Sequence, residues 1–299
     1  MSALSVPRTM ARAANVHPCR LPAGPLGDLA ALRADVPAAA PRRSPVLLVP
    51  GFTGSKEDFQ ALLPLLAAAG HPAWAVDLRG QYESTGPDDE AAYAIEALAA
   101  DVAVAFDTVR DGAPAHLVGH SFGGLVCRRA VLSGLTGVAS YTLLGSGPAG
   151  IPPPTADTLG FLRPILEQGG VAAVWQAADQ LNTDPAAIAA PPDVREFLGV
   201  RFLANNPAGL AAMAQDLVGE PDLTDALRDR GLPLLIAHGA ADDAWPPAVQ
   251  KEMAARLGAD YVEIPDSIHS PAVENTERTA EVLTGFWQQV ETAAATGAR

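Results

Sequence analysis

The chain has 299 residues, which fits one large domain or two small ones and can bury an apolar core without disulfides or a metal ion. Its formal net charge of −14 opposes binding to nucleic-acid phosphates and, more weakly, to anionic membrane surfaces. No stretch approaches the roughly 18 consecutive apolar residues of a membrane span, so we expect neither nucleic acid nor membrane as a partner.

The first residues, 1–12, are expected to form a frayed leader. They contain two arginines but no apolar core segment, which a secretory signal requires. Cys19 and Cys127 lie far apart in sequence, and a reduced state is the simplest interpretation for two such cysteines. We therefore expect a cytoplasmic location.

After this leader, strand and helix patterns alternate along most of the chain. Pro-Ala-Gly-Pro turn chemistry between alternating residues predicts a strand hairpin over residues 19–36. Further strands are predicted at 46–49, 73–76, 115–118, 138–145, 232–239 and 260–264. Helices are predicted at 56–70, 89–110, 122–133, 247–258 and 275–294. Such alternation predicts an α/β fold with a mostly parallel, doubly wound sheet and helices on both faces.

The alternation stops between Pro148 and Leu232. Four segments there are predicted to be helical with no strand between them, at 159–168, 171–180, 192–206 and 207–218. We therefore expect a core of residues 1–147 and 233–299, with a helical insertion at 148–232. Such an insertion can pack on the sheet as extra helices or form a lid over the strand ends.

Ser121 lies in a tight glycine frame just past the strand predicted at 115–118. This is the carboxyl end of a strand, where open parallel sheets carry their sites. A serine on a sharp turn from strand into helix has a strained backbone, and the residues two positions away, Gly119 and Gly123, must be tiny. The turn lifts the hydroxyl clear of the sheet and lets the next amide face an anion. The alternative is a tight glycine turn with an idle serine.

A serine hydroxyl needs a base that takes its proton, usually a histidine oriented by a carboxylate. Of the six histidines, His269 alone lies in a loop, between the last strand and the last helix, that can reach over a strand end. His120 adjoins Ser121, but the sharp turn directs neighbouring side chains apart. The remaining histidines lie near the terminus, in a connecting loop or in strands: His17, His71, His116 and His238.

Three acids compete to orient that histidine. Asp242 and Asp243 follow the strand that ends near His238, and Asp266 is close to His269 in sequence. Asp266 could equally be an exposed turn residue. Asp242 is preferred over Asp243 as the orienting carboxylate.

Five segments in order make the chain resemble serine hydrolases of the α/β-hydrolase fold, esterase- or lipase-like and with a helical cap, across about residues 40–295. They are LLVPGFTGS, VDLRGQYESTGP, LVGHSFGGL, GAADDAWP and SIHSP. Such proteins usually carry Gly-x-x-Asp with a proline four residues later. Gly239, Asp242 and Pro246 fit that register, so the resemblance also favours Asp242.

The resemblance also implies an oxyanion hole, in which two backbone amides stabilise the negative charge that develops on an attacked carbonyl oxygen. These amides would be those of Phe52 and Phe122. Many relatives have His-Gly where this chain has Pro50-Gly51, which changes the support of the hole but not the amide itself. Tyr82 stands where relatives often have glycine and could narrow the mouth of a pocket.

The insertion falls where such relatives carry a cap, which favours the lid. Its apolar side chains could line a pocket for an acyl or ring group, or simply pack the helices: Phe161, Leu162, Trp175, Phe197 and Phe202. We expect a small-molecule substrate with an apolar acyl or ring group. Neither the substrate's identity nor the oligomeric state follows from the sequence.

The resemblance implies hydrolysis of a carboxylic ester, lactone or thioester through an acyl-enzyme, with no metal or cofactor required. The alternatives with the same residues are a carbon–carbon bond hydrolase and a cofactor-free peroxidase or perhydrolase. Dehalogenases and epoxide hydrolases are disfavoured, since they usually place aspartate where Ser121 stands. A non-catalytic small-molecule binding protein is the remaining possibility.

Overall fold

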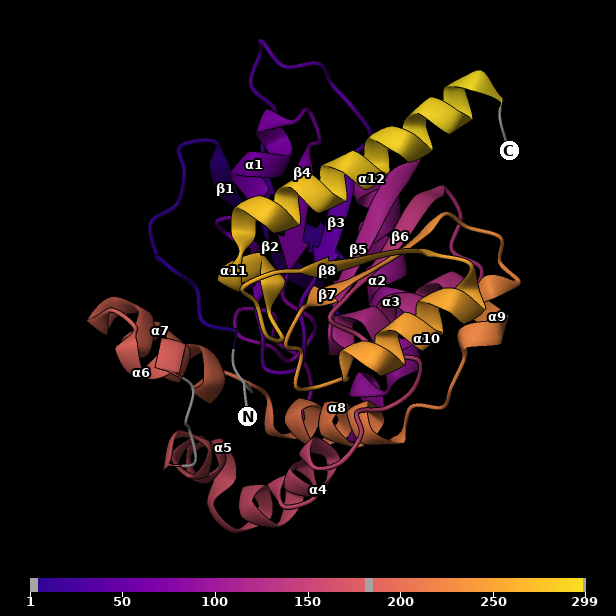
Figure 1. Ribbon diagram of the computed structural model, residues 1–299. Coiled ribbons are helices and arrows are strands. Elements are labelled where there is room, and N and C mark those ends of the chain that lie inside the picture. Colours follow the sequence, from indigo (N-terminus) through magenta and orange to yellow (C-terminus); the bar gives the residue numbers. More distant parts are fainter. Residues whose placement is uncertain (1–4, 181–184, 298–299) are drawn as a thin grey trace.

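The computed structural model describes residues 5–180 and 185–297, and its strands form a single mixed sheet (Figure 1). The order across the sheet is β1-β2-β4-β3-β5-β6-β7-β8. The strands are β1 (Val16–Pro22), β2 (Asp28–Ala34), β3 (Val46–Val49), β4 (Ala73–Val76), β5 (Ala115–His120), β6 (Val138–Leu144), β7 (Leu234–Gly239) and β8 (Asp260–Ile264). The β1–β2 hairpin and the β2–β4 pair are antiparallel, whereas every pair from β4 to β8 is parallel. The predicted α/β class is therefore confirmed.

Helices cover both faces of the sheet and one of its ends. They are η1 (Lys56–Phe59), α1 (Leu63–Ala68), η2 (Glu90–Tyr93), α2 (Ile95–Arg110), α3 (Phe122–Leu132), α4 (Thr155–Leu159), α5 (Leu162–Gln180), α6 (Pro185–Ala189), α7 (Pro192–Leu203), α8 (Pro207–Gly219), α9 (Thr224–Arg228), α10 (Pro247–Leu257), α11 (Pro271–Glu274) and α12 (Thr276–Thr296). Figure 1 shows α12 crossing one face of the sheet, whereas α2, α3 and α10 lie on the other.

The central strands are buried because each of their faces contacts a helix layer. In β3, Leu47 and Val49 pack into the core with α2, α3 and α10, whereas Val46 and Leu48 pack into the core with α1 and α12. Successive side chains of a strand point to opposite faces, so a strand between two layers has to be apolar at every position. The uninterrupted apolar run at 46–49 follows from this position.

Two predicted helices are shorter than the sequence pattern suggested. The segment 56–70 divides into η1 and α1, because Pro64 lacks an amide hydrogen and is accommodated in the first turn of α1. The segment 89–110 divides into η2 and α2 at Ala94, whose ψ of 143° is not helical. The amide of Ile95, the first residue of α2, donates to Asp216 Oδ2 of α8 at 2.8 Å, so a tertiary contact sets this boundary.

The helices α4–α9 all lie between β6 and β7, in the predicted insertion at 148–232. Figure 1 shows α4, α5, α6, α7 and α8 at one end of the sheet. A small apolar core of their own joins α5, α7 and α8, whereas α9 contacts the sheet-covering helices α3 and α10. In α5, Gly170 has a φ of 68° and interrupts the helix. The helices α4, α6 and α9 were not expected from the sequence.

The prediction of a frayed leader is wrong for its described part, residues 5–12. Ser5 Oγ lies 2.8 Å from Ser270 Oγ, and Arg8 Nε donates to the carbonyl oxygen of Val273 at 2.8 Å. The Gln60 side chain donates to two backbone carbonyls of this segment. These contacts hold the segment along the loop and helix that follow β8. Within the described ranges, no helix is both long and apolar enough to cross a bilayer.

Candidate active site

Ser121 occupies the turn between β5 and α3. The strand ends at His120 and the helix begins at Phe122, so a single residue makes the change of direction. Its φ of 52° and ψ of −122° are unfavourable for a residue with a side chain. A hydrogen bond of 3.0 Å from the Ser121 amide to the carbonyl of Leu144, at the end of β6, holds this conformation.

Glycines allow neighbouring backbone to approach this turn closely. A Cβ on Gly119 would lie 2.5 Å from the carbonyl oxygen of Gly123 and 2.6 Å from the Cα of Gly124. A Cβ on Gly51, after β3, would lie 2.9 Å from the Cβ of Ser121. The glycine frame is therefore a steric requirement of the turn, as the sequence pattern predicted.

We expect Gly119→Ala to destabilise the fold by about 1–3 kcal/mol, because the new methyl group meets only backbone atoms that cannot rotate away. For a chain of this size this lowers the Tm by several degrees, measured by thermal unfolding. Gly285→Ala is the matched control: Gly285 lies in α12, is exposed, and a Cβ there would meet nothing within 4 Å. Because alanine favours the helix more than glycine does, Gly285→Ala should leave the free energy of unfolding unchanged or raise it by up to about 1 kcal/mol. Equal Tm values for the two variants would contradict this steric argument.

The structure brings Ser121, His269 and Asp242 together in one chain of hydrogen bonds. His269 Nε2 lies 2.9 Å from Ser121 Oγ, and His269 Nδ1 lies 3.0 Å from Asp242 Oδ1. Asp242 follows β7, and His269 lies in the loop between β8 and α11. The three residues come from the carboxyl ends of three strands, so the parallel sheet places them at one end.

Asp242 is held by groups that favour its ionised form. Its Oδ1 accepts from the amide of Ala244 at 2.9 Å, and its Oδ2 accepts from the side chain of Gln250 at 2.8 Å. Burial alone would raise the pKa of Asp242, but the adjacent His269 and these donors together lower it. The carboxylate is therefore charged at neutral pH and accepts the Nδ1–H of His269.

The acids around His269 raise its pKa. Burial is the largest single effect and disfavours the charged ring, but the Asp242 carboxylate and its hydrogen bond, with Asp243 and Glu274, together raise the pKa of His269 above its ordinary value. With the proton on Nδ1, the neutral ring presents the Nε2 lone pair to the hydroxyl of Ser121. The arrangement can remove a proton from Ser121 as a nucleophilic bond forms.

Two backbone amides beside Ser121 have no acceptor among the described residues. Phe122 is the first residue of α3, so its amide has no partner within the helix. The amide of Phe52, next to the close contact between Gly51 and Ser121, also donates to no protein group in the described ranges. Free amides on the two sides of a serine hydroxyl suit the binding of a negative oxygen.

Comparison with known proteins agrees with this geometry. The model of a family described as the alpha/beta hydrolase family matches residues 46–282, which is most of the chain. The chain belongs to the alpha/beta hydrolase family. The match contains Ser121, Asp242 and His269, in that order along the chain.

Individual relatives of this α/β hydrolase differ in what they are named for. A protein of Variovorax paradoxus (strain S110), named as a carbamate hydrolase, RutD, is 40% identical over 101 residues, which are 34% of this chain and 37% of that protein. A thermophilic esterase from Thermogutta terrifontis has a TM-score of 0.74 at 23% identity, and the alignment covers 92% of this chain and 99% of the esterase. A bromoperoxidase from Bacillus anthracis has a TM-score of 0.71 at 18% identity, covering 91% of this chain and 100% of that one. The two structural similarities establish the fold alone.

His120 supports the site in a way that the sequence did not predict. Its Nε2 lies 2.9 Å from the carbonyl oxygen of His269 and must carry a proton, because a carbonyl only accepts. Burial, reinforced by the nearby His269, lowers the pKa of His120 to about 3, so the ring is uncharged at neutral pH. His120 makes no hydrogen bond with the Ser121 hydroxyl, yet it fixes the backbone of the loop that carries His269. The only sequence signal for this role of His120 was its position next to Ser121.

The expected pocket-lining side chains of this hydrolase separate into different surroundings. Leu162, Trp175 and Phe202 pack into the core of the insertion, and Phe52 packs against the same cluster. Phe197 forms an edge contact with Tyr82, with ring centroids 5.6 Å apart. Phe161 is 68% exposed. The side chain of Phe52 therefore packs against the helical insertion, while its own backbone amide is one of the two free amides.

A buried ion pair also joins the insertion to the loop after β3. Arg201 of α7 donates through Nη1 to Asp58 Oδ1 at 2.5 Å, and the two side chains are only 1% and 2% exposed. Asp58 in turn accepts from the amide of Ser55, in the segment that follows Phe52. The charges of Arg201 and Asp58 thereby fix α7 against this loop.

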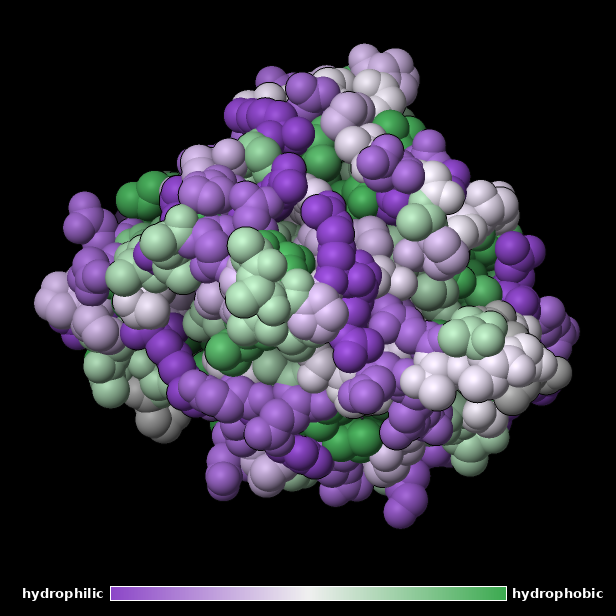
Figure 2. All heavy atoms as spheres, turned by 90° about the horizontal axis from the view of Figure 1, so that it is seen from above, coloured by the Kyte–Doolittle hydropathy of each residue, from purple (hydrophilic) through white to green (hydrophobic). Residues whose placement is uncertain are grey.

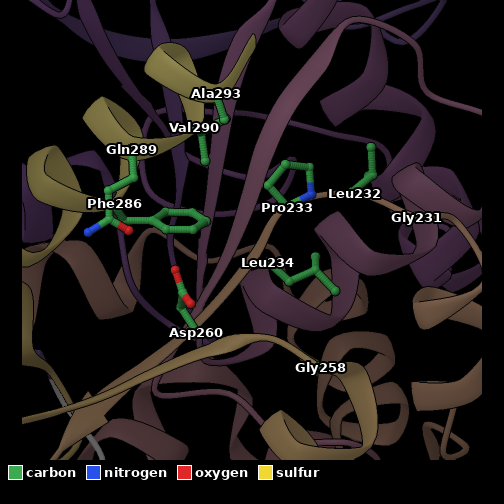
Figure 3. Close-up of a pocket in the computed structure, with 10 residues that line it drawn as sticks. All are labelled: Gly231, Leu232, Pro233, Leu234, Gly258, Asp260, Phe286, Gln289, Val290 and Ala293. Carbon is green, nitrogen blue, oxygen red and sulfur yellow. The ribbon is translucent and has the colours of Figure 1, made fainter. Parts of the chain in front are cut away.

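A separate hollow of about 430 Å³ lies away from these residues (Figure 3). Residues at the start of β7 form one side of it, and Phe286, Val290 and Ala293 of α12 form the other. Its position at the amino ends of the strands is opposite to that of Ser121. Figure 2 looks onto this end of the molecule and shows mostly hydrophilic side chains with small hydrophobic patches. This hollow is therefore not part of the candidate active site.

Proposed function

We propose that this α/β hydrolase cleaves a carboxylic ester, lactone or thioester through an acyl-enzyme. The hydrogen-bonded chain of Ser121, His269 and Asp242 beside two free amides is the observation that carries the proposal. Ser121 is the nucleophile, His269 is the general base and then the general acid, and Asp242 orients the ring and stabilises its charged form.

In the first half-reaction, Ser121 Oγ attacks the carbonyl carbon as His269 Nε2 takes its proton. The carbonyl oxygen becomes negative and accepts hydrogen bonds from the amides of Phe52 and Phe122, each worth about 3 kcal/mol. His269 then gives its proton to the departing alcohol or thiol, which leaves the acyl group on Ser121. In the second half-reaction, His269 takes a proton from water, the hydroxide attacks the acyl-enzyme, and the proton returns to Ser121.

The names of the relatives widen the range of bonds to be tested. The Thermogutta terrifontis protein is an esterase, the Variovorax paradoxus protein is named as a carbamate hydrolase, and the Bacillus anthracis protein is a bromoperoxidase. The carbamate reaction would use the same attack on a carbonyl carbon. The carbon–carbon hydrolase and the cofactor-free peroxidase or perhydrolase are kept as alternatives, and a purely binding role is the last of them.

A substrate panel with a covalent probe tests the proposal. We expect p-nitrophenyl acetate and butyrate to be hydrolysed and a fluorophosphonate probe to label Ser121, identified by mass spectrometry of the modified peptide. Turnover of diketones or of peroxide with no ester hydrolysis would favour an alternative bond. Absence of both labelling and turnover in folded protein would favour the binding role.

The substrate and the location of the protein are also proposals. We propose a small molecule with an apolar acyl or ring group, because apolar side chains of the insertion and Phe52 pack together beside the free amides. We propose a cytoplasmic location, which agrees with two cysteines that are both free thiols, Cys127 being buried. Cell fractionation with antibody detection tests the location.

A further inference from the structure

Two histidines and a glutamate, far apart in sequence, meet at the end of the sheet opposite Ser121. His71 precedes β4, His116 lies near the start of β5, and Glu291 lies in the last turns of α12. One ligand atom from each residue lies within 4.8 Å of the other two. His116 is five residues before Ser121 in an extended strand, so the two sites are about 16 Å apart.

The two imidazoles are fixed in place by packing. His71 and His116 are 1% and 0% exposed, and both rings contact the indole of Trp287. The His116 ring stacks on Trp287 with centroids 4.8 Å apart and an angle of 12° between the planes. The His71 ring meets the same indole edge-on at 4.9 Å. Rings that packing already orients lose little entropy when they bind an ion.

Hydrogen bonds leave the correct atoms available to an ion. His71 Nδ1 lies 2.9 Å from the carbonyl oxygen of Ser44, so Nδ1 carries the proton and the neutral ring has its lone pair on Nε2. His116 Nδ1 lies 2.7 Å from Ser140 Oγ, and when Nδ1–H donates a hydrogen bond to this hydroxyl the lone pair of the ring is on Nε2, which faces Glu291. Ligating histidines in metalloproteins usually make such a hydrogen bond through the second ring nitrogen.

Glu291 is supported in the same manner. Its Oε1 accepts from the amide of Ser44 at 3.1 Å, and its Oε2 accepts from Arg43 at 3.1 Å. Its Oε1 also lies 3.5 Å from His116 Nε2, a contact that an ion bound between these two atoms would replace. Its side chain is 22% exposed, so it is the member of the cluster that solvent reaches. Oε1 is the oxygen that contacts His116, whereas Oε2 accepts from Arg43.

We propose that His71, His116 and Glu291 form a binding site for a divalent transition-metal ion, with Zn²⁺ as the best fit. Two imidazole nitrogens and one carboxylate oxygen are a common zinc ligand set, with ligand distances of about 2.0–2.2 Å and a fourth position for water. Donors in a tetrahedral site are about 3.3 Å apart, close to the 3.5 Å between His116 Nε2 and Glu291 Oε1. Donors 4.8 Å apart place a central ion about 2.8 Å from each, so ligation requires each donor to move by less than about 1 Å.

The surroundings predict an ion that stabilises the fold and binds with moderate affinity. The ligands join β5 and the loop before β4 to α12, so an ion there would fasten the terminal helix to the sheet. The positive charge of Arg43 beside Glu291 opposes a cation. We therefore expect weaker binding than at a structural site with four protein ligands. This role is independent of the reaction at Ser121.

Metal titration of the chelator-treated full-length protein tests the site without any activity assay. We expect Zn²⁺ to bind with 1:1 stoichiometry by calorimetry, to raise the Tm and to change the fluorescence of Trp287. Co²⁺ should produce the visible absorption bands of a tetrahedral site. Glu291→Gln keeps the size of the side chain but removes its charge, and it should weaken Zn²⁺ binding at least 100-fold. His71→Gln should have a comparable effect.

Two control variants separate this site from other histidines. His17→Ala removes an exposed imidazole, and His269→Ala removes the one near Ser121, so both should keep the 1:1 binding. Unchanged affinity in Glu291→Gln, or loss of binding in His269→Ala, would overturn the proposal. Absence of Zn²⁺ binding to the wild-type protein below about 0.1 mM would overturn it as well. If His71→Gln fails to fold, Glu291→Gln on the half-buried side of the cluster still decides the question.

Discussion

Ser121→Ala is expected to lower kcat/KM for p-nitrophenyl butyrate by about 10⁴–10⁶-fold while leaving the fold intact. The substitution removes the only atom that forms the covalent bond to the substrate. Its methyl group fits where the serine Cβ already lies, so the turn between β5 and α3 is retained. The measurement is steady-state kinetics, with circular dichroism and the Tm as evidence of folding.

Ser133→Ala is the matched control for this result. Ser133 ends the same helix, α3, and its hydroxyl donates only to the carbonyl of Ala130 at 2.8 Å. This variant should retain full activity and full labelling by a fluorophosphonate. If folded Ser121→Ala kept more than about a tenth of the wild-type rate, the assignment of the nucleophile would be wrong.

Asp242→Asn is expected to lower kcat/KM by about 10³–10⁴-fold, with little change in structure. Asparagine has the same shape, but it carries no charge to stabilise the imidazolium of His269. Its amide nitrogen either faces the Nδ1–H of His269 or opposes the side chain of Gln250, which now donates to Oδ2 at 2.8 Å. The first arrangement disturbs the tautomer that directs a lone pair at Ser121, and the second keeps this tautomer but sets two donors against each other at Gln250. Asp243→Asn, at the exposed neighbour, is the control and should change the rate less than about threefold.

The pH profile provides a second measurement on the same variant. The reaction needs neutral His269, so kcat/KM should rise with pH through the pKa of this residue, at a midpoint above its ordinary value of about 6.5. Burial lowers this pKa, whereas Asp242, its hydrogen bond to the ring, Asp243 and Glu274 together raise it above the ordinary value. Removing the Asp242 carboxylate removes the largest of the effects that oppose burial, so the midpoint in Asp242→Asn should move to lower pH. A midpoint that is the same in both proteins would show that His269 does not control the rate.

Local sequence patterns were sufficient to predict the sharp turn at Ser121 and most strands of the sheet. The frame of Gly119 and Gly123 around Ser121 is a steric condition within five residues, and the apolar runs follow from burial on two faces. His269 could be selected because it is the histidine in the loop between the last strand and the last helix, which can reach over a strand end. Asp242 needed more than local reasoning, since Asp243 has the same chemistry and only the register of the motif separates them.

Features that depend on distant residues were not predictable in this way. The start of α2 is set by Asp216, which is 121 positions from Ile95, and no local pattern reports such a contact. His120 seemed directed away from the site, but its ring reaches the carbonyl of His269, 149 positions along the chain. His71, His116 and Glu291 look unrelated in sequence because the topology alone brings β5 and α12 together. That these three side chains could bind one ion follows only from their positions in the folded structure.

The Arg201–Asp58 pair has a consequence for how substrates are admitted. An outward rigid-body movement of α7 would separate the charges of Arg201 and Asp58, whose side chains are 1% and 2% exposed. Removing one partner of a buried pair costs about 3–5 kcal/mol, because the other charge is left buried without it. An open state in which α7 leaves while Asp58 stays buried is therefore rare. Smaller motions that keep the pair intact cost less, and an opening made by them would favour slender, flexible substrates over rigid, bulky ones.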